Sequence, residues 1–185
     1  AIKSGRLSAS LTPSIADTFI IAVPTPFKKG NKSIPEANLD YLFESIRSIS
    51  TFLKEDNLVI IESTSPIGTT KSSSKLIHEL TGFDERQIKI AYCPERVLPG
   101  NIMHEIVHND RIIGGVNLEA SLAAKELYQS FCKGNIHLTD DKTAELTKLA
   151  ENSFRDVNIA FANELSMVCD KNGINARELI NLTNY

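Results

Sequence analysis

The amino-acid sequence predicts an α/β fold in which a parallel β-sheet is followed by one long helix. Short strand-like runs alternate with longer helical patterns through most of the chain, as in βαβ units. Several of the short runs are apolar throughout, which is typical of strands covered by helices on both faces. Near residue 140 the alternation stops and a single extended helical repeat begins.

Five strands are expected, each a short run rich in apolar residues. The clearest are residues 18–23, 58–61 and 88–92, and the less distinct ones are residues 112–115 and 136–139. Between them apolar positions recur at helical spacing, which predicts amphipathic helices that contain residues 39–53, 76–80 and 122–131.

The long helix is expected to begin at Asp140 or Asp141, since either carboxylate is a plausible N-cap. Its apolar repeat runs from Leu146 to Val168 and stops at Lys-Asn-Gly 171–173, where the glycine fits the C′ position. A helix of this length exceeds the usual globular size, so it is expected to span two domains or a subunit interface. Because the chain lacks an initiating Met and its last residues resemble an unfinished helix, we expect a piece of a longer protein.

Composition and charge exclude several classes of partner. The 185 residues carry a formal net charge of −3, which gives no whole-chain electrostatic case for nucleic acid or an anionic membrane. No apolar run reaches membrane-spanning length, and no leader-like segment is seen. The three cysteines are far apart and suggest no disulfide framework, which favours a reducing compartment. We therefore predict a cytoplasmic protein without nucleic-acid or membrane partners.

Three polar motifs each follow a predicted strand. They are Pro-Thr-Pro at 24–26, Glu-Ser-Thr-Ser-Pro at 62–66 and Pro-Glu-Arg at 94–96. In doubly wound sheets ligands bind at the carboxyl ends of the strands. One such motif alone is more often a simple turn, whereas three on successive strands favour a ligand site.

A second group of candidate residues lies on the long helix. Lys148 and Asn152 are four residues apart and share one helix face, with Arg155 close to the same face. Together these side chains can hold an oxyanion and a phosphate or carboxylate. The competing interpretation is a solvated stripe, but the apolar neighbours Leu149, Phe154 and Val157 suggest that the stripe borders a buried surface.

Metal and thiol chemistry receive little support. His104 and His108 are four residues apart, but no third ligand accompanies them, so a surface pair is expected and no metal site is predicted. Cys93 is expected to be a packed thiol because it follows a buried strand. The nearby Glu95 argues against a stabilised thiolate, because a carboxylate raises the pKa of a thiol. No GxGxxG occurs. From the residues alone, the sequence indicates part of an α/β ligand-binding domain and leaves open whether it is an enzyme.

Four blocks of the sequence resemble consecutive blocks of the UDP-glucose/GDP-mannose dehydrogenase family. They are Ala-Val-Pro-Thr-Pro at 22–26, Glu-Ser-Thr-Ser-Pro-Ile-Gly-Thr at 62–69, Tyr-Cys-Pro-Glu-Arg-Val-Leu-Pro-Gly at 92–100 and Lys-Leu-Ala-Glu-Asn-Ser-Phe-Arg-Asp-Val-Asn-Ile-Ala-Phe-Ala-Asn-Glu at 148–164. Their order and spacing fit, and the resemblance covers essentially the whole chain. The Pro-Glu-Arg-Val-Leu-Pro-Gly and Asn-Ser-Phe-Arg-Asp-Val-Asn stretches are similar to the branch that acts on UDP-N-acetyl-D-mannosamine.

The resemblance implies how the chain divides into domains. Residues 1–139 would be the C-terminal part of a dinucleotide-binding domain, with the distal half of a Rossmann-like parallel sheet. Residues 140–185 would begin an all-α central dimerisation domain, and a homodimer through the long helix is expected. The family's Gly-rich phosphate turn is not found in this chain, and none of its cysteines matches the nucleophilic Gly-His-Cys type motif. We therefore expect the isolated chain to be inactive.

The resemblance also implies a reaction and its residues. The reaction is two successive oxidations by NAD at C6 of a UDP-N-acetylhexosamine, from alcohol to aldehyde and from aldehyde to acid. Lys148 would be the ionisable group nearest the reacting oxygen, and Asn152 would help to position it. Glu95 would act with water to hydrolyse a thioester, Thr64 would lie between cofactor and water, and Thr25 would contact the cofactor.

Substrate contacts are implied at Arg96, Val97, Lys148, Asn152 and Arg155. We expect the three polar turns to gather along one rim, faced by Lys148 and Asn152. Two alternatives remain, another UDP-hexose or hexosamine 6-dehydrogenase and a non-catalytic dimerisation module. A third, a related β-hydroxyacid dehydrogenase, is disfavoured by the loop at 94–100.

Overall fold

The computed structural model describes residues 4–30, 33–97 and 100–183. Two compact units make up the chain, Ala1–Thr147 and Lys148–Tyr185. The first unit is a layered α/β structure and the second is helical.

The first unit is built on a five-stranded sheet in the order β1-β2-β3-β4-β5. The strands are β1 (Thr18–Ile21), β2 (Leu58–Ile61), β3 (Lys89–Tyr92), β4 (Arg111–Gly115) and β5 (Ile136–Asp140). The first three are parallel and in register, so that their carboxyl ends lie at the same edge of the sheet. This edge is where the sequence places its three polar motifs.

The expected wholly parallel sheet is wrong in one respect, because β4 runs antiparallel to β3 while β5 is parallel to β4. The connection from β3 to β4 explains the reversal. In the described part of this connection, residues 93–97 and 100–110, the one helix is α3 (Ile102–His108), a short helix that was not predicted from the sequence and that has no buried residue. A parallel crossover needs a helix packed on the sheet to carry the chain back to the starting edge, and α3 does not supply one.

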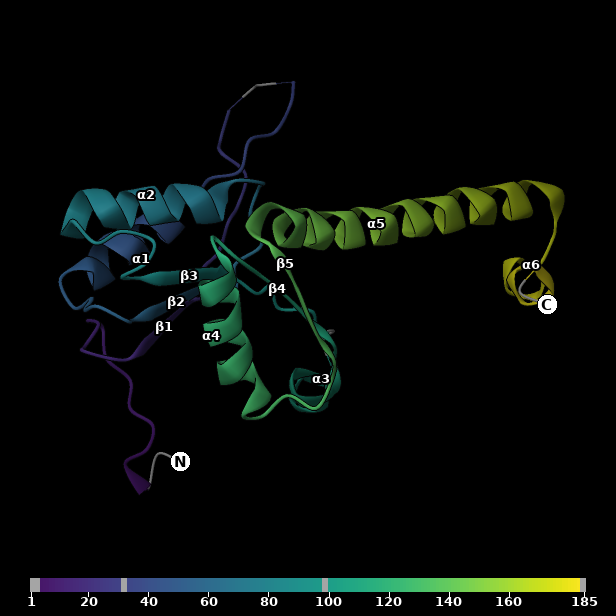
Figure 1. The fold of residues 1–185 in the computed structure, drawn as a ribbon. Helices are drawn as coiled ribbons and strands as arrows, with labels where there is room; N and C mark the ends of the chain where they lie inside the picture. Colours follow the sequence, from purple (N-terminus) through teal and green to yellow (C-terminus); the bar gives the residue numbers. More distant parts are fainter. Residues whose placement is uncertain (1–3, 31–32, 98–99, 184–185) are drawn as a thin grey trace. The chain divides into compact units, whose positions relative to one another are not determined.

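Helices cover the two faces of this sheet (Figure 1). On one face, α1 (Asp40–Ser50) and α2 (Thr69–Thr81) pack on a core that includes Val59 and Ile61. On the other face, α4 (Leu118–Gln129) packs on a core that includes Leu58 and Ile60. Successive residues of a strand point to opposite faces, so a strand with a helix layer on each side must be apolar throughout.

The first strand departs from this expectation. It ends at Ile21 and not at Val23, and Ile20 remains 50% exposed because β1 is the outer strand of the described sheet. The other predicted strands and the predicted helices are present, with ends that differ by a few residues.

Helices α5 (Asp141–Asn172) and α6 (Ala176–Thr183) form the C-terminal part of the chain. Of the two candidate caps, Asp140 is the N-cap, because its carboxylate accepts hydrogen bonds from the Thr143 backbone N–H and hydroxyl at 2.9 and 2.6 Å. The predicted C-terminal glycine is confirmed, with Gly173 at φ +65°. The N–H of Ile174 donates to the Cys169 carbonyl at 3.0 Å, which closes a Schellman motif.

Candidate functional site

The loops that follow β1 and β2 are joined by a direct hydrogen bond. Thr25 Oγ1 donates to the Thr64 carbonyl oxygen at 2.6 Å, and both threonines are half-buried. Ser63 strengthens the link, because its hydroxyl accepts from the Val23 backbone N–H at 2.8 Å. The two predicted cofactor-site residues therefore lie together at the carboxyl edge of the sheet.

The loop that follows β3 places Glu95, Arg96 and Val97 side by side and half-buried. The Glu95 carboxylate accepts a hydrogen bond from the Val97 backbone N–H, which fixes the carboxylate within its own turn. Arg96 is held by the segment just before β4: its Nη1 donates to the Asp110 carbonyl at 3.2 Å, and Asn109 Nδ2 donates to the Arg96 carbonyl at 3.3 Å.

A buried polar cluster under these loops was not predicted. Arg111, the first residue of β4, is only 7% exposed, and its guanidinium carbon lies 4.4 Å from the centre of the Tyr128 ring. Tyr128 donates its hydroxyl hydrogen to Glu62 at 2.5 Å. The sequence carried a weak signal for this cluster, a charged residue at the head of an apolar strand, but the predicted strand began one residue later.

Cys93 belongs to the same cluster, and its expected role as a packed thiol is confirmed. Burial raises the pKa of the Cys93 thiol to about 11, while nearby Arg111 acts in the opposite direction. The carboxylate that adds to the increase in pKa is Glu62 and not the predicted Glu95. Burial likewise raises the pKa of Tyr128 well above its ordinary value.

A second unpredicted residue, Glu145, occupies the N-terminus of α2. Its side chain is fully buried and accepts hydrogen bonds from the backbone N–H groups of Gly68 and Thr70 at 2.5 and 2.7 Å. The Thr70 hydroxyl donates to it as well, at 2.6 Å. The N–H groups that could otherwise bind a phosphate at the start of this helix are thus satisfied by a protein carboxylate. An isolated acid inside a helical repeat gave no local sign of this contact.

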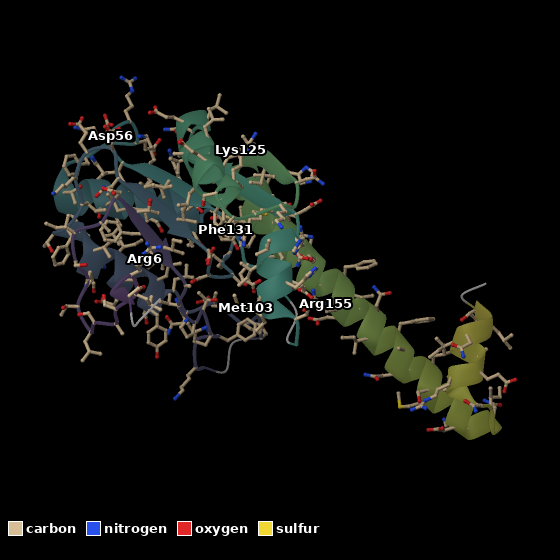
Figure 2. The ribbon with its side chains drawn as sticks, turned by 90° about the horizontal axis from the view of Figure 1, so that it is seen from below. Arg6, Asp56, Met103, Lys125, Phe131 and Arg155 are labelled. Carbon is tan, nitrogen blue, oxygen red and sulfur yellow. The ribbon has the colours of Figure 1, made fainter. Side chains whose placement is uncertain are left out.

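The other predicted site residues lie on α5 in the second unit. Lys148 and Asn152 are half-buried and Arg155 is exposed, and Figure 2 shows side chains standing out along the helix, Arg155 among them. Of the apolar residues expected to border a buried surface, Leu149 is half-buried, whereas Phe154 is 73% and Val157 is 67% exposed in this chain. That Lys148 and Asn152 face the strand-end loops stays a prediction.

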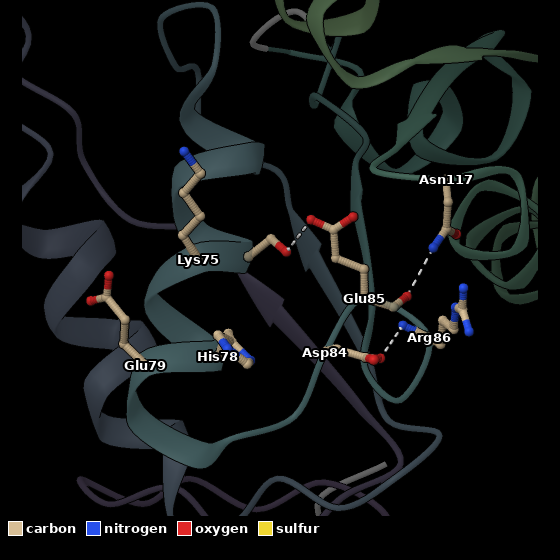
Figure 3. A pocket seen from close by; sticks show the side chains of 8 residues that line it. Lys75, His78, Glu79, Asp84, Glu85, Arg86 and Asn117 are labelled. Atoms are coloured by element: carbon tan, nitrogen blue, oxygen red, sulfur yellow. Dashed lines mark hydrogen bonds between the residues drawn. The ribbon is translucent and has the colours of Figure 1, made fainter.

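An open groove of about 730 Å³ lies away from these loops, between α2 and the segment that precedes β3 (Figure 3). Its walls carry both signs of charge, and part of this charge is already paired. Ser74 Oγ donates to Glu85 at 3.1 Å, Asn117 Nδ2 donates to the Glu85 carbonyl at 2.8 Å, and the hydrogen bond from Lys71 lowers the pKa of the Glu85 carboxyl. The groove contains none of the predicted site residues.

In the described ranges, no group of three or more His, Cys, Asp or Glu side chains is arranged to hold a metal ion. His104 and His108 stack with their ring centres 4.1 Å apart on α3. Among the helices of the described residues, none combines the length and apolar character that crossing a membrane requires.

Comparison with known protein families gives two matches that together cover most of the chain. Residues 1–132 match the NAD binding domain of the UDP-glucose/GDP-mannose dehydrogenase family, and residues 142–185 match the central domain of the same family.

Individual relatives agree with this match. The chain is 51% identical to the UDP-N-acetyl-D-mannosamine dehydrogenase of Campylobacter jejuni, over 99% of this chain and 46% of that protein. It is 46% identical to an NDP-N-acetyl-D-galactosaminuronic acid dehydrogenase of Ralstonia solanacearum, over the whole chain and 44% of that protein. The solved UDP-D-ManNAc dehydrogenase of Pyrococcus horikoshii superposes with a TM-score of 0.87 at 45% identity, over 92% of this chain and 40% of that one. The chain thus spans less than half the length of these relatives.

Proposed function

Because the chain belongs to the UDP-glucose/GDP-mannose dehydrogenase family, we propose that the whole protein oxidises C6 of UDP-N-acetyl-D-mannosamine to the uronic acid with two molecules of NAD. The observation that carries this proposal is the meeting of the Thr25, Thr64 and Glu95 loops at the carboxyl ends of three adjacent parallel strands. This is the edge of an α/β sheet where a ligand is expected.

The NAD-binding role rests on the edge that Thr25 and Thr64 share. Both residues are half-buried, so each keeps a face that a ligand can reach, and the hydrogen bond from the Thr25 hydroxyl to the Thr64 carbonyl links the two loops. These residues would hold the nicotinamide end of the cofactor. The start of α2 does not fit the pyrophosphate, because Glu145 already occupies it. When bound, NAD supplies a hydride acceptor next to C6.

We assign the remaining roles as follows. Lys148 accepts the proton of the C6 hydroxyl or stabilises the negative charge that develops on its oxygen, and Asn152 orients that oxygen. The acyl-enzyme thioester would form on the cysteine of the family's Gly-His-Cys type motif, which is not among residues 1–185. Glu95 activates the water that hydrolyses this thioester, a role for which the Val97 N–H holds the carboxylate in place. Arg96, Val97 and Arg155 contact the substrate. Cys93 is not the nucleophile in this scheme, because burial raises the pKa of its thiol.

The assay measures NADH formation by the whole protein with UDP-N-acetylmannosamine, and in parallel with UDP-N-acetylglucosamine, UDP-N-acetylgalactosamine and UDP-glucose. We expect two NADH per UDP-N-acetylmannosamine and slower turnover of the other sugars. Faster turnover of UDP-N-acetylgalactosamine would favour the alternative of another UDP-hexosamine 6-dehydrogenase, which the name of the Ralstonia solanacearum relative suggests. No turnover of any nucleotide sugar would contradict the proposal and favour the dimerisation module. Replacing NAD with NADP tests the cofactor.

Lys148→Met tests the assignment of the helix residue. Loss of a positioned proton acceptor typically costs about 100-fold or more in rate, so we expect kcat to fall by at least that factor. Lys171→Met removes a lysine from an exposed position of the same helix and serves as the matched control. Equal activity of the two variants would show that Lys148 has no role in the reaction.

The organisation of the whole protein follows from the same proposal. We place the domain boundary near residue 140, a position supported by the two family matches, which end at 132 and begin at 142. Homodimer formation through α5 is supported by the exposed apolar side chains of that helix. We also propose a cytoplasmic enzyme that supplies a UDP-linked uronic acid for polysaccharide synthesis, in keeping with its widely spaced cysteines.

A further inference from the structure

Arg111 is a buried cation that no role proposed above uses. Its guanidinium lies over the Tyr128 ring and 5.5 Å from the centre of the Phe131 ring, and its Nη2 donates to the Ile106 carbonyl at 3.2 Å. A guanidinium stays charged under physiological conditions, and burying it costs free energy that an apolar side chain of similar volume would not cost. A buried arginine of this kind suggests that its role is to hold neighbouring groups in position.

The contacts of Arg111 reach the starts of two strand-end loops. Its Nη1 lies 4.0 Å from Oε1 of Glu62, and Glu62 is the first residue after β2. The same nitrogen lies 3.9 Å from the sulfur of Cys93, which is the first residue after β3. Tyr128 ties the arrangement together, because its ring lies under the guanidinium while its hydroxyl donates to Glu62. One side chain therefore links the loop that carries Thr64 to the loop that carries Glu95.

Packing beneath the second loop is close. Glu95, Arg96, Val97 and Arg111 line a hollow of only about 10 Å³, roughly the space of one water molecule. The two residues directly before Arg111 in the chain are those that hold Arg96. A shift of the Arg111 backbone would therefore move the groups that hold Arg96, while a shift of its head group would act on Cys93 at the start of the same loop.

We infer that Arg111 is a positioning residue, which fixes the spacing between the Thr64 loop and the Glu95–Val97 turn. The inference rests on the proposed function, because its importance for activity depends on those loops being the site. Tyr128 assists Arg111 in this role, since it contacts the guanidinium with its ring and Glu62 with its hydroxyl.

The test compares Arg111→Lys, Arg111→Met and Tyr128→Phe in the whole protein, with Arg47→Met as the control. Arg47 is an exposed arginine on α1 that pairs only with its helix neighbour Glu44 among the ion pairs of the described residues. Displacing a positioned group by about 1 Å costs up to roughly 100-fold in rate. We expect Arg111→Lys to lower kcat/KM for the nucleotide sugar by about 10- to 100-fold, with KM for NAD nearly unchanged. Tyr128→Phe should have a smaller effect of the same kind, and Arg47→Met none.

Amide hydrogen exchange gives a readout that does not require activity. We expect Arg111→Lys to speed exchange in peptides that cover residues 94–97 while exchange in α1 and α2 stays at the wild-type rate. Uniformly faster exchange, or full activity per folded molecule with only a lower Tm, would show a merely structural role and overturn the inference. If Arg111→Met does not fold, the lysine and Tyr128→Phe variants decide the outcome. An inactive wild type would refute the proposed function, while the exchange measurement would still test Arg111.

Discussion

Cys93 shows how burial of one residue sets a dependence on pH. The thiol has an ordinary pKa of 9.0, and burial raises its pKa in the folded protein to about 11. The folded state therefore favours the neutral thiol, so this contribution to stability is complete below about pH 9 and is lost as the pH rises through about 11.

We predict that ionisation of Cys93 lowers the free energy of unfolding by roughly 2–3 kcal/mol between about pH 8 and about pH 12. Urea unfolding of the wild type and of Cys93→Ala across this range measures it. Both proteins should lose some stability, because burial also raises the pKa of Tyr92 and of Tyr128. Parallel pH profiles for the two proteins would show that Cys93 does not titrate as described.

Residues that act through distant partners were the ones that sequence reasoning missed. The sequence could place Thr25, Thr64 and Glu95 at the carboxyl edge of the sheet because each follows an apolar run, and such a run is visible locally in the chain. Arg111 and Glu145 were not predicted, because their partners lie up to 77 residues away and nothing local identifies them. From sequence alone, loops at strand ends are therefore easier to predict than buried charged residues whose partners are distant in the chain.

At the scale of an element, the start of α2 depends on Glu145. A glutamine can accept hydrogen bonds through one oxygen only, and its amide nitrogen would meet a backbone N–H. We predict that Glu145→Gln lowers the free energy of unfolding by about 2–4 kcal/mol, as expected when a buried charged acceptor is lost. Glu126→Gln, at an exposed position of α4, is the control and should change stability by less than about 0.5 kcal/mol.

Urea unfolding monitored by circular dichroism measures the difference between these two variants. Hydrogen exchange at Gly68 and Thr70 adds a local check, because both amides should exchange faster in Glu145→Gln. Equal stability of the two variants would mean that the three hydrogen bonds of Glu145 contribute no net free energy.

Elements were predicted better than their arrangement. Apolar runs and helical repeats identified all five strands and five of the six helices of the described chain, since each depends on periodicity that the sequence carries directly. The direction of β4 was missed because it depends on how residues 93–110 pack. The short helix α3 has no buried residue, and therefore no apolar face that would have marked it in the sequence.

At the scale of the whole molecule, α5 carries a row of exposed apolar side chains. Phe154, Val157 and Phe161 are three and four residues apart, and each is at least 66% exposed. Burial of one large apolar side chain contributes about 1.5–3 kcal/mol, so a partner helix on this row would be strongly stabilised. We predict that the wild-type protein sediments as a dimer in sedimentation velocity. The Phe154→Asp/Phe161→Asp double variant should shift towards the monomer.

Asp170→Lys is the control for this experiment. At about 100° per residue, Asp170 lies on the opposite side of α5 from Phe154 and Phe161, and it is exposed. The control should sediment as the wild type does. A wild type that stays monomeric at high concentration would contradict the proposed helix interface.

The reversal of direction between β3 and β4 gives the sheet a seam. In the described residues, the register between β3 and β4 has two residue pairs, Ala91 with Gly115 and Tyr92 with Gly114, and the Val116 N–H extends the contact by donating to the Ile90 carbonyl at 3.0 Å. So short a ladder contributes few hydrogen bonds, and side chains that contact strands on both sides of it must therefore add to the stability of the sheet. Helix α4 spans the seam by packing on strands from both sides, and Arg111 does the same from within β4. The turn at 94–97 follows directly from β3, so the proposed site lies at the place where the two halves of the sheet meet.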